Sequence, residues 1–503
     1  MTAHRLAMGG VLIAYLALGA LYAIRTPLWQ APDEPAHYNY IAHILDEGPD
    51  PPEMAPGDYP AERLESLKAE RFKGEPTVAG IEYEDYQPPA YYYAAAAAAL
   101  AAGSQARDRV RAIRLFGVLL GAATVWLSSR VALLAAPGDP RLAVAVAGFV
   151  AFLPMHLAVT ASVNNDSLAY LLCTALVWLS LARASLRIGS RRFVASAALL
   201  LGLGLLTKVS VYPAAALVAA AEASVWWRAR GTGSPVPRLA AGSGNTGLTA
   251  GSGAAPVATG DGGAELAAGS GGDELAEGRA VRFVDALRRV VIAFGVAALI
   301  GLPWFARNAL VYGPQDPLGT AAHNQVVEGQ PLTADWLAEQ GRVALARRFV
   351  VFTFDSFWGV FGWLGVFLDQ RIYLSLAVLS VAAGAGLALY AIRLSRAPGA
   401  WSDTRRACLA LLALAAALAA AVYVAYNFTY VQHQGRYLFP ALAPIATMFC
   451  LGIREWPRRA ARKLRLAESQ RIALEAVALY GLTVAMAALS LISLQLYIVP
   501  GLG

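Results

Sequence analysis

Long apolar runs recur along this chain and constrain its fold more than any other feature. Eleven runs are predicted to cross a membrane, which takes about 20 apolar residues in each helix. They are residues 8–24, 112–135, 142–161, 167–186, 193–207, 209–227, 289–310, 372–393, 407–425, 438–453 and 472–498. Of the 503 residues 57% are hydrophobic and 15% are charged, whereas an ordinary soluble domain has about 25% charged residues. The sequence therefore predicts an all-α polytopic membrane protein.

Basic residues between the apolar runs predict how the chain is oriented. The largest cluster is Arg454, Arg458, Arg459, Arg462, Lys463 and Arg465. Because cytoplasmic loops carry an excess of Lys and Arg, we expect this cluster to lie inside and the long loops 25–110 and 311–371 to lie outside. The net charge of +7 comes largely from such clusters, so we expect a lipid bilayer around the chain and no nucleic-acid partner.

Composition divides the chain into three parts. Residues 1–227 are predicted to be an N-terminal transmembrane catalytic module that includes the loop 25–110. Residues 228–288 are rich in Gly, Ala, Ser and Thr, which cannot bury a core, and are predicted to be a flexible cytoplasmic linker. Residues 289–503 are predicted to be a C-terminal transmembrane module that includes the loop 311–371.

Each external loop contains an apolar segment too short or too irregular to be a span. The alanine-rich residues 89–103 fall short of the length needed to cross the hydrocarbon core. The aromatic stretch 349–367 has the composition of a helix that lies at the membrane surface. We therefore expect one interfacial helix in each of these segments.

An acid pair between two prolines follows the first apolar run. Pro32, Asp33, Glu34 and Pro35 stand where a membrane helix is expected to meet water. Proline restricts its own backbone and that of the preceding residue, so we expect a short rigid turn through the pair. A partly desolvated carboxylate within reach of water suits general-base chemistry on a hydroxyl. The alternative is that Asp33 or Glu34 merely caps a helix that begins near Ala36.

Further polar residues follow the ends of other apolar runs on the same external side. The candidates for substrate binding are His37, Tyr91, Asn165, Asp166, Lys208, Arg307, Asn308, Gln434, Arg436 and Tyr437. Polar residues at membrane depth are costly and tend to mark a pathway or a site, so their convergence on one face favours function.

Simpler interpretations stay open for several of these candidates. Asp166 would cap a helix that starts at Ser167. Lys208 and Arg436 would simply extend their charged ends to the membrane surface. His37 is expected to form hydrogen bonds within the protein rather than to bind a metal.

Several of these residues lie in motifs that resemble those of the C-type membrane glycosyltransferases, the GT-C superfamily. The motifs are Pro32-Asp33-Glu34-Pro35, Gln87-Pro88-Pro89-Ala90-Tyr91-Tyr92, Asn165-Asp166, Thr207-Lys208, Pro303-Trp304 with Arg307-Asn308, and Gln434-Gly435-Arg436-Tyr437 with Pro440. Their order and spacing over roughly residues 1–450 are most similar to the family 39 group, which includes protein mannosyltransferases and lipid A aminoarabinose transferases. The segment 228–288 departs from that family.

The resemblance implies a GT-C-like bundle and an inverting glycosyltransferase. Such an enzyme moves a sugar from a polyprenyl-phosphate donor to a hydroxyl of a cell-envelope glycan, lipid or protein. The resemblance puts the catalytic base on Asp33, with Glu34 beside it. We expect Lys208 and Arg436 to bind the donor phosphate, because cations stabilise its charge as it leaves.

Cofactor, location and competing functions follow from the same residues. No cofactor is certain, although Asp33 and Asp166 are of the type that binds Mg²⁺ or Mn²⁺. The expected location is the plasma (inner) membrane of a bacterium, with the site facing the periplasm or exterior. The main alternative is a transporter or flippase of a lipid-linked or anionic solute, which is expected to show repeat symmetry. A non-catalytic scaffold is the third interpretation.

Overall fold

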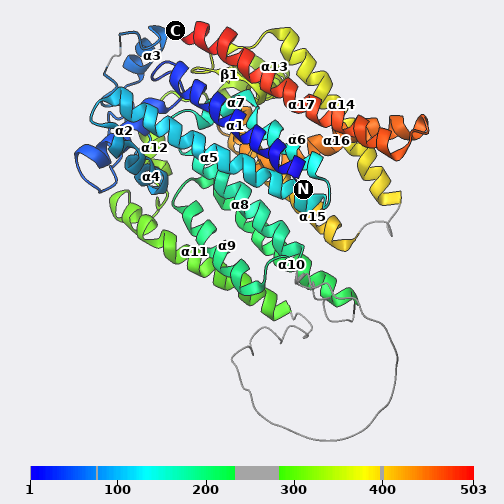
Figure 1. Ribbon diagram of the computed structural model, residues 1–503. Helices are drawn as coiled ribbons and strands as arrows, with labels where there is room; N and C mark the ends of the chain where they lie inside the picture. Colours follow the sequence, from blue (N-terminus) through cyan, green and yellow to red (C-terminus); the bar gives the residue numbers. More distant parts are fainter. Residues whose placement is uncertain (1, 75–76, 233–282, 397–401) are drawn as a thin grey trace, which may run out of the picture.

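The computed structural model describes residues 2–74, 77–232, 283–396 and 402–503, which form a bundle of long helices (Figure 1). Within these residues, nine helices are long and apolar enough to cross a membrane. They are α1 (Thr2–Arg25), α5 (Ala106–Ala135), α8 (Asp166–Ala184), η2 with α10 (Val209–Ala214, Ala215–Thr232), α11 (Phe283–Val311), α14 (Gln370–Arg396), α15 (Asp403–Asn427), η4 with α16 (Gly435–Ala441, Leu442–Lys463) and α17 with η5 and α18 (Glu468–Ile492, Ser493–Ile498, Val499–Leu502). The predicted all-α membrane fold is thereby confirmed.

Two of the eleven predicted spans take a different form. Residues 142–161 fall in two helices, α6 (Pro140–Ala151) and α7 (Pro154–Thr160), which are bent by 61° relative to each other. Pro154 explains the break, because proline lacks an N–H group and cannot continue the preceding helix. The span predicted at 193–207 is α9 (Ser190–Leu205), whose 16 residues pack against α8 and α11. At about 24 Å it is shorter than the hydrocarbon core of about 30 Å.

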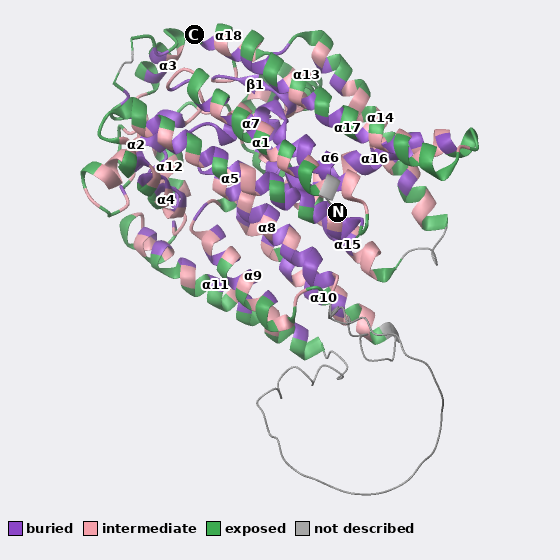
Figure 2. Cartoon of the chain, in the orientation of Figure 1, coloured by how far each residue is buried: buried purple, intermediate pink, exposed green. Residues whose placement is uncertain are grey.

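The transmembrane helices bury two apolar cores. One joins α1, α6 and α16 through residues such as Tyr15, Phe149 and Leu451, and the other joins α8, α10 and α15. Large apolar side chains such as Leu119 and Val381 are exposed on the outside of the bundle. Figure 2 shows buried residues concentrated inside the bundle and exposed ones on its outer faces. An apolar outer surface of this kind suits a chain surrounded by lipid.

The loop between α1 and α5 forms a layer of short helices at one end of the bundle. It contains α2 (Glu34–Asp46), α3 (Ala61–Ala69) and α4 (Ala90–Ala99) with η1 (Leu100–Ala102), and α12 (Thr320–Val326) lies beside them (Figure 1). A third apolar core, with Tyr40, Ile81 and Tyr91, holds this layer together. The 10 residues of α4 and 3 of η1 extend about 20 Å, which is too short to span the membrane, as predicted.

The helix predicted over residues 349–367 is only partly correct. Helix α13 (Thr333–Trp358) ends at Trp358, and an antiparallel hairpin of β1 (Val360–Phe361) and β2 (Val366–Phe367) follows. The prediction is wrong beyond Trp358 because the turn contains Gly362 at φ 60°, a conformation that glycine adopts without strain.

The linker was predicted over residues 228–288, but both of its ends belong to helices. Residues 228–232 belong to α10 and residues 283–288 belong to α11. Residues 233–282 lie outside the described part of the chain.

Candidate active site

Asp33 occupies a strained turn immediately before α2. Its backbone φ is 66°, a value that residues other than glycine rarely adopt and that is concentrated at functional sites. Its side chain makes no capping hydrogen bond to the helix, so the capping alternative is wrong for Asp33. Instead, the Tyr83 hydroxyl donates to Oδ1 at 3.0 Å and Arg436 Nη2 donates to Oδ2 at 3.3 Å. The Asp33 side chain is 29% exposed and is therefore accessible to a ligand.

Glu34, the other member of the acid pair, has a closed environment. It begins α2, so the expectation that the prolines would exclude it from a helix is wrong; Pro35 stands in the first turn, where its missing N–H is tolerated. Arg114 Nε and Nη2 donate to its two carboxylate oxygens at 2.7 and 2.5 Å. The backbone N–H groups of Trp29 and Val163 donate to the same oxygens at 3.0 and 3.1 Å. These partners favour a positioning role for Glu34 over the predicted catalytic one.

Arg114 connects three elements around this turn. Besides Glu34, it donates to the backbone carbonyls of Ala23, Thr26 and Pro27 at 3.1, 2.7 and 3.0 Å. A guanidinium group has five N–H donors, so one α5 side chain satisfies both the end of α1 and the start of α2. The orientation of the Asp33 turn therefore depends on this buried arginine.

Asp166 and Lys208 form a second charged pair at the site. Helix α8 begins at Asp166, and Lys208 lies in extended backbone just before η2. Lys208 Nζ donates to Asp166 Oδ1 at 2.6 Å. The lysine side chain is 21% exposed and is therefore partly accessible. The pairing favours a place in the site over the interpretation of Lys208 as a lysine that only extends its charged end to the membrane surface.

Arg436 approaches the same place from η4. Its guanidinium is buried and lies 5.7 Å from the centre of the neighbouring Tyr437 ring. Nη2 contacts Asp33, whereas Nε is buried with no hydrogen-bond partner among the described residues. Because an unsatisfied buried donor is costly, this nitrogen is suited to an acceptor oxygen of a ligand.

The environment of His37 links these side chains electrostatically. The pKa of His37 is lowered to about 3, mainly by burial and also by the positive charges of Lys208 and Arg436, whereas Asp33 and Asp166 act in the opposite direction. The ring is therefore neutral at pH 7, and Nδ1 is 2.8 Å from the Tyr92 hydroxyl, in keeping with the expected hydrogen bond. Because all four charges act on one imidazole, they belong to a single site.

The described residues contain no group of three or more His, Cys, Asp or Glu side chains that could hold a metal ion. Asp33 has Arg436 as its cationic partner and Asp166 has Lys208. Binding of Mg²⁺ or Mn²⁺ by these two carboxylates stays a prediction.

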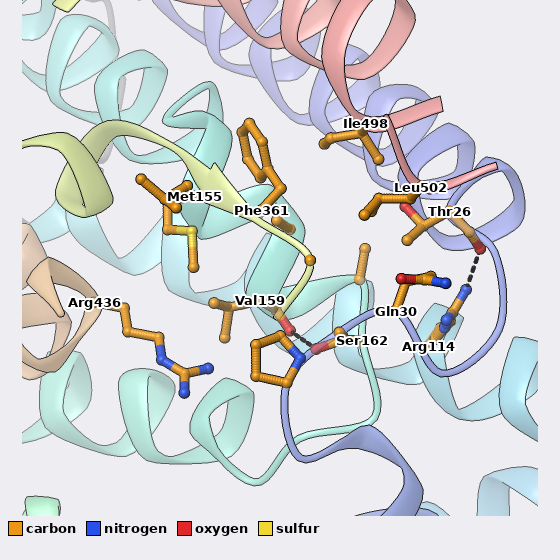
Figure 3. A pocket seen from close by; sticks show the side chains of 16 residues that line it. Thr26, Gln30, Arg114, Met155, Val159, Ser162, Phe361, Arg436, Ile498 and Leu502 are labelled. Atoms are coloured by element: carbon orange, nitrogen blue, oxygen red, sulfur yellow. Dashed lines mark hydrogen bonds between the residues drawn. The ribbon is translucent and has the colours of Figure 1, made fainter. Parts of the chain in front are cut away.

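Two largely apolar cavities are each lined in part by residues of η4. The first has about 490 Å³ of empty space, part of it open to the outside, and lies beside Pro32 and Arg436 (Figure 3). The second has about 440 Å³, again partly open, and lies between α8, α10 and α15 next to Tyr437. The consecutive residues Arg436 and Tyr437 thus each line one cavity.

Comparison with known proteins identifies the family. The family model DUF2142, described as a predicted membrane protein, matches residues 16–445. The chain belongs to the DUF2142 family. No curated protein matches it.

Some solved structures are similar to this chain. The oligosaccharyltransferase of Archaeoglobus fulgidus, tethered with an acceptor peptide, is 13% identical with a TM-score of 0.46; the match covers 96% of this chain and 55% of that one. ArnT from Cupriavidus metallidurans in the apo state is 12% identical with a TM-score of 0.48, covering 97% and 76%. This DUF2142 chain thus spans about half the length of the archaeal enzyme. Both scores are below 0.5.

Arg307 and Asn308, predicted to bind substrate, form hydrogen bonds with loops in this DUF2142 chain. Arg307 Nη2 donates to the carbonyls of Pro51 and Pro52 at 2.9 and 2.8 Å. Asn308 Nδ2 donates to the carbonyl of Pro317 at 3.2 Å. These bonds join the end of α11 to both external loops, which favours a structural role for the two residues.

Four other predicted residues border the charged site. The Tyr91 hydroxyl accepts a bond from the backbone of Asn164 at 3.1 Å, so it supports the turn before Asp166. Asn165 and Gln434 each have a side-chain carbonyl oxygen that is buried without a partner among the described residues. Tyr437 lies beside Arg436 and lines the second cavity.

Three residues with a place in the site were not predicted: Tyr83, Arg114 and Glu84. Burial raises the pKa of Glu84 to about 8, helped by the nearby negative charge of Asp33, so its carboxyl group is protonated at neutral pH. Gln87 Nε2 donates to Glu84 at 2.8 Å, and Gln87 Oε1 accepts from Asn165 Nδ2 at 3.2 Å. The sequence signal that could have led to Tyr83 and Glu84 is the Gln87-Pro88-Pro89 motif, which lies in the same loop.

Proposed function

We propose that this protein is an inverting membrane glycosyltransferase that moves a sugar from a polyprenyl-phosphate donor to an acceptor hydroxyl on the external face of the membrane. The observation that carries the proposal is the Asp33 carboxylate, partly exposed and held by Tyr83 and Arg436 beside the Asp166–Lys208 pair. A base and two cations at the edge of an apolar bundle match the requirements of a lipid-linked sugar phosphate.

The reaction is a single displacement at the anomeric carbon. Asp33 accepts the proton of the acceptor hydroxyl while the oxygen forms a bond to that carbon. The bond between the carbon and the phosphate oxygen breaks, and the electron pair leaves with the polyprenyl phosphate. Arg436 and Lys208 stabilise the charge that develops on this phosphate. One displacement inverts the anomeric configuration.

The donor fits the side of the site that faces the second cavity. This cavity is lined by apolar residues from membrane-spanning helices, including Leu217 and Leu418, and a polyprenyl tail requires such surroundings. Tyr437 lies at its edge next to Arg436, so a tail in the cavity brings a phosphate toward the guanidinium. Asp166, Asn165 and Gln434 are the groups available for sugar hydroxyls.

The acceptor is a glycan, lipid or protein of the cell envelope, and the enzyme acts in the plasma (inner) membrane of a bacterium with its site facing the periplasm or exterior. The excess of arginine and lysine at the opposite end of the bundle supports this orientation.

The proposal is tested by transfer from radiolabelled polyprenyl-phosphate hexoses and pentoses to cell-envelope extract, with purified protein in lipid. Asp33→Asn keeps the size of the side chain but removes the base, and we expect transfer to fall by about 10²–10⁴-fold. Asp50→Asn, the same change at an exposed position of the same loop, is the matched control and keeps full activity.

Each other outcome has a definite meaning. Equal transfer by wild type and Asp33→Asn contradicts the assignment of the base. No transfer from any donor, together with movement of the labelled lipid across liposomes, contradicts the transferase and indicates a transporter.

A further inference from the structure

The first cavity adjoins the proposed base and is separate from the proposed donor cavity. It is bounded by the Asp33 turn through Pro32, by α7 through Met155 and Ala158, by the β1 hairpin through Phe361, and by α18 through Leu502 (Figure 3). Arg436 also lines the cavity, on the side away from Arg114 and Leu502 in Figure 3. A cavity in this position is available to a second substrate when the donor occupies the other one.

The position of the proposed base, Asp33, indicates which substrate binds in the first cavity. A general base must be within hydrogen-bond reach of the proton that it removes, and that proton is on the acceptor hydroxyl. Pro32 is adjacent to Asp33 in the chain and lines this cavity, whereas the cavity beside Tyr437 has no lining residue from this turn. The acceptor therefore belongs on the side of the first cavity.

The lining of this cavity favours hydrocarbon over a polar chain. Several of its polar side chains already have partners within the protein: Arg114 is bound to Glu34, Gln30 donates to the carbonyl of Arg71 at 2.6 Å, and the Ser162 hydroxyl donates to the carbonyl of Val159 at 2.8 Å. Apart from Arg436 Nε, which is unpaired among the described residues, the lining leaves few groups to pair with a peptide or a free glycan, whose polar groups would be buried at a cost of about 1–3 kcal/mol each. Hydrocarbon needs no such partners.

We propose that the acceptor is a membrane lipid whose hydrocarbon part occupies the first cavity and whose head group presents its hydroxyl to Asp33. The inference rests on the proposed transferase function and names the acceptor class for it. The bonds that form and break are those of the displacement described above: the lipid hydroxyl loses its proton to Asp33, and polyprenyl phosphate is the leaving group.

The test supplies two acceptor preparations to the purified protein in phosphatidylcholine vesicles, which offer no free head-group hydroxyl. One is a protein-free lipid extract of bacterial envelope, and the other is delipidated envelope protein and glycan. With a radiolabelled polyprenyl-phosphate sugar, we expect label in a new polar lipid from the first preparation and none from the second.

Three alanine-to-phenylalanine variants separate the two cavities. Ala158→Phe fills the first cavity and is expected to raise the amount of lipid extract needed for half-maximal rate by about tenfold or more, without changing the KM for the donor. Ala419→Phe fills the second cavity and is expected to raise the KM for the donor and not the lipid requirement. Ala17→Phe, at an exposed position of α1 that lines neither cavity, changes neither value. Ala158→Leu is the milder variant if phenylalanine lowers the yield of folded protein.

The outcomes distinguish this inference from the proposed function. Label in the delipidated protein or glycan, or an unchanged lipid requirement in a folded Ala158 variant, overturns the lipid acceptor and leaves the transferase intact. No transfer to either preparation and no release of sugar from the donor overturn the transferase itself.

Discussion

The two ends of the bundle use buried carboxylates in different ways. At the end that carries the basic clusters, the Glu222 side chain is 1% exposed and accepts bonds from Arg183 and Arg289 at 2.6 and 2.8 Å. Glu455 is equally buried and is bound by Arg393 at 2.9 Å and Arg462 at 3.3 Å. Each carboxylate thus joins helices through at least two guanidinium groups, and neither is accessible to a ligand.

At the opposite end, Asp33 has one cationic partner at 3.3 Å and remains partly exposed. Glu34, the next residue, resembles Glu222 rather than Asp33, because it is fully buried and bidentate with Arg114. The difference shows that enclosure, not position along the chain, separates carboxylates that stabilise the fold from one that can take part in chemistry. Replacing a carboxylate that stabilises the fold should therefore lower the free energy of unfolding, whereas disturbing the one that takes part in chemistry should lower the transfer rate.

The largest effect on this comparison is expected from Arg436→Leu. This change removes the cation beside Asp33, and loss of one charge-stabilising donor typically costs about 10²–10³-fold in kcat. Transfer kinetics and thermal unfolding are measured together. Arg371→Leu, which changes an exposed arginine at the start of α14, is the control and keeps wild-type kcat. A loss of folded protein without a loss of kcat would place Arg436 with the structural arginines instead.

Glu222→Gln is expected to lower stability and to leave the transfer rate unchanged. Breaking a buried ion pair by removing one partner costs about 3–5 kcal/mol, because Arg183 and Arg289 lose their counter-charge. The free energy of unfolding in lipid nanodiscs should fall by this amount, while transfer per folded molecule stays at the wild-type value. Reduced transfer with unchanged stability would mean that the two ends are not functionally distinct.

Sequence reasoning located much of the fold and part of the site, for physical reasons. Apolar runs predict membrane helices because lipid excludes charges wherever a helix crosses. The distribution of basic residues then predicted that four residues lie on the same face: Asp33, Asp166, Lys208 and Arg436. In the structure Arg436 contacts Asp33 and Lys208 contacts Asp166, and all four charges act on the pKa of His37. These inferences needed only the order of polar and apolar residues.

Pairings between distant residues were out of reach of the same reasoning. Arg114 and Glu34 are 80 positions apart, and which arginine meets which acid depends on how α5 packs against α1. The two cavities likewise arise from side chains of several helices. The hairpin after Trp358 was missed because the aromatic composition of residues 349–367 predicted a helix despite their glycines. Packing, rather than composition, decides the first two, and the conformation of a glycine-containing turn decides the third.

Lys208→Met is a smaller change within the site. It removes the ammonium group from Asp166 and from the donor phosphate, so we expect the KM for the donor to rise about tenfold, equivalent to about 1.4 kcal/mol. Lys208→Arg keeps the charge and should recover most of the affinity. The KM for the acceptor is measured in parallel, and a change confined to the acceptor would assign Lys208 to the other substrate.

The smallest effect is expected from Glu84. This carboxyl group is buried, as Glu222 is, but it lies near Asp33 at the candidate site. Burial raises its pKa from 4.5 to about 8, and its partner Gln87 is neutral. Its folded pKa lies above its unfolded pKa, so its contribution to stability is complete below about pH 4.5 and is lost as the pH rises through about 8. Wild-type protein should therefore lose roughly 1–2 °C more in Tm than Glu84→Gln between pH 6 and 9. Parallel Tm curves for the two proteins would mean that Glu84 is ionised across this range, and that the site contains one more negative charge than the proposed mechanism uses.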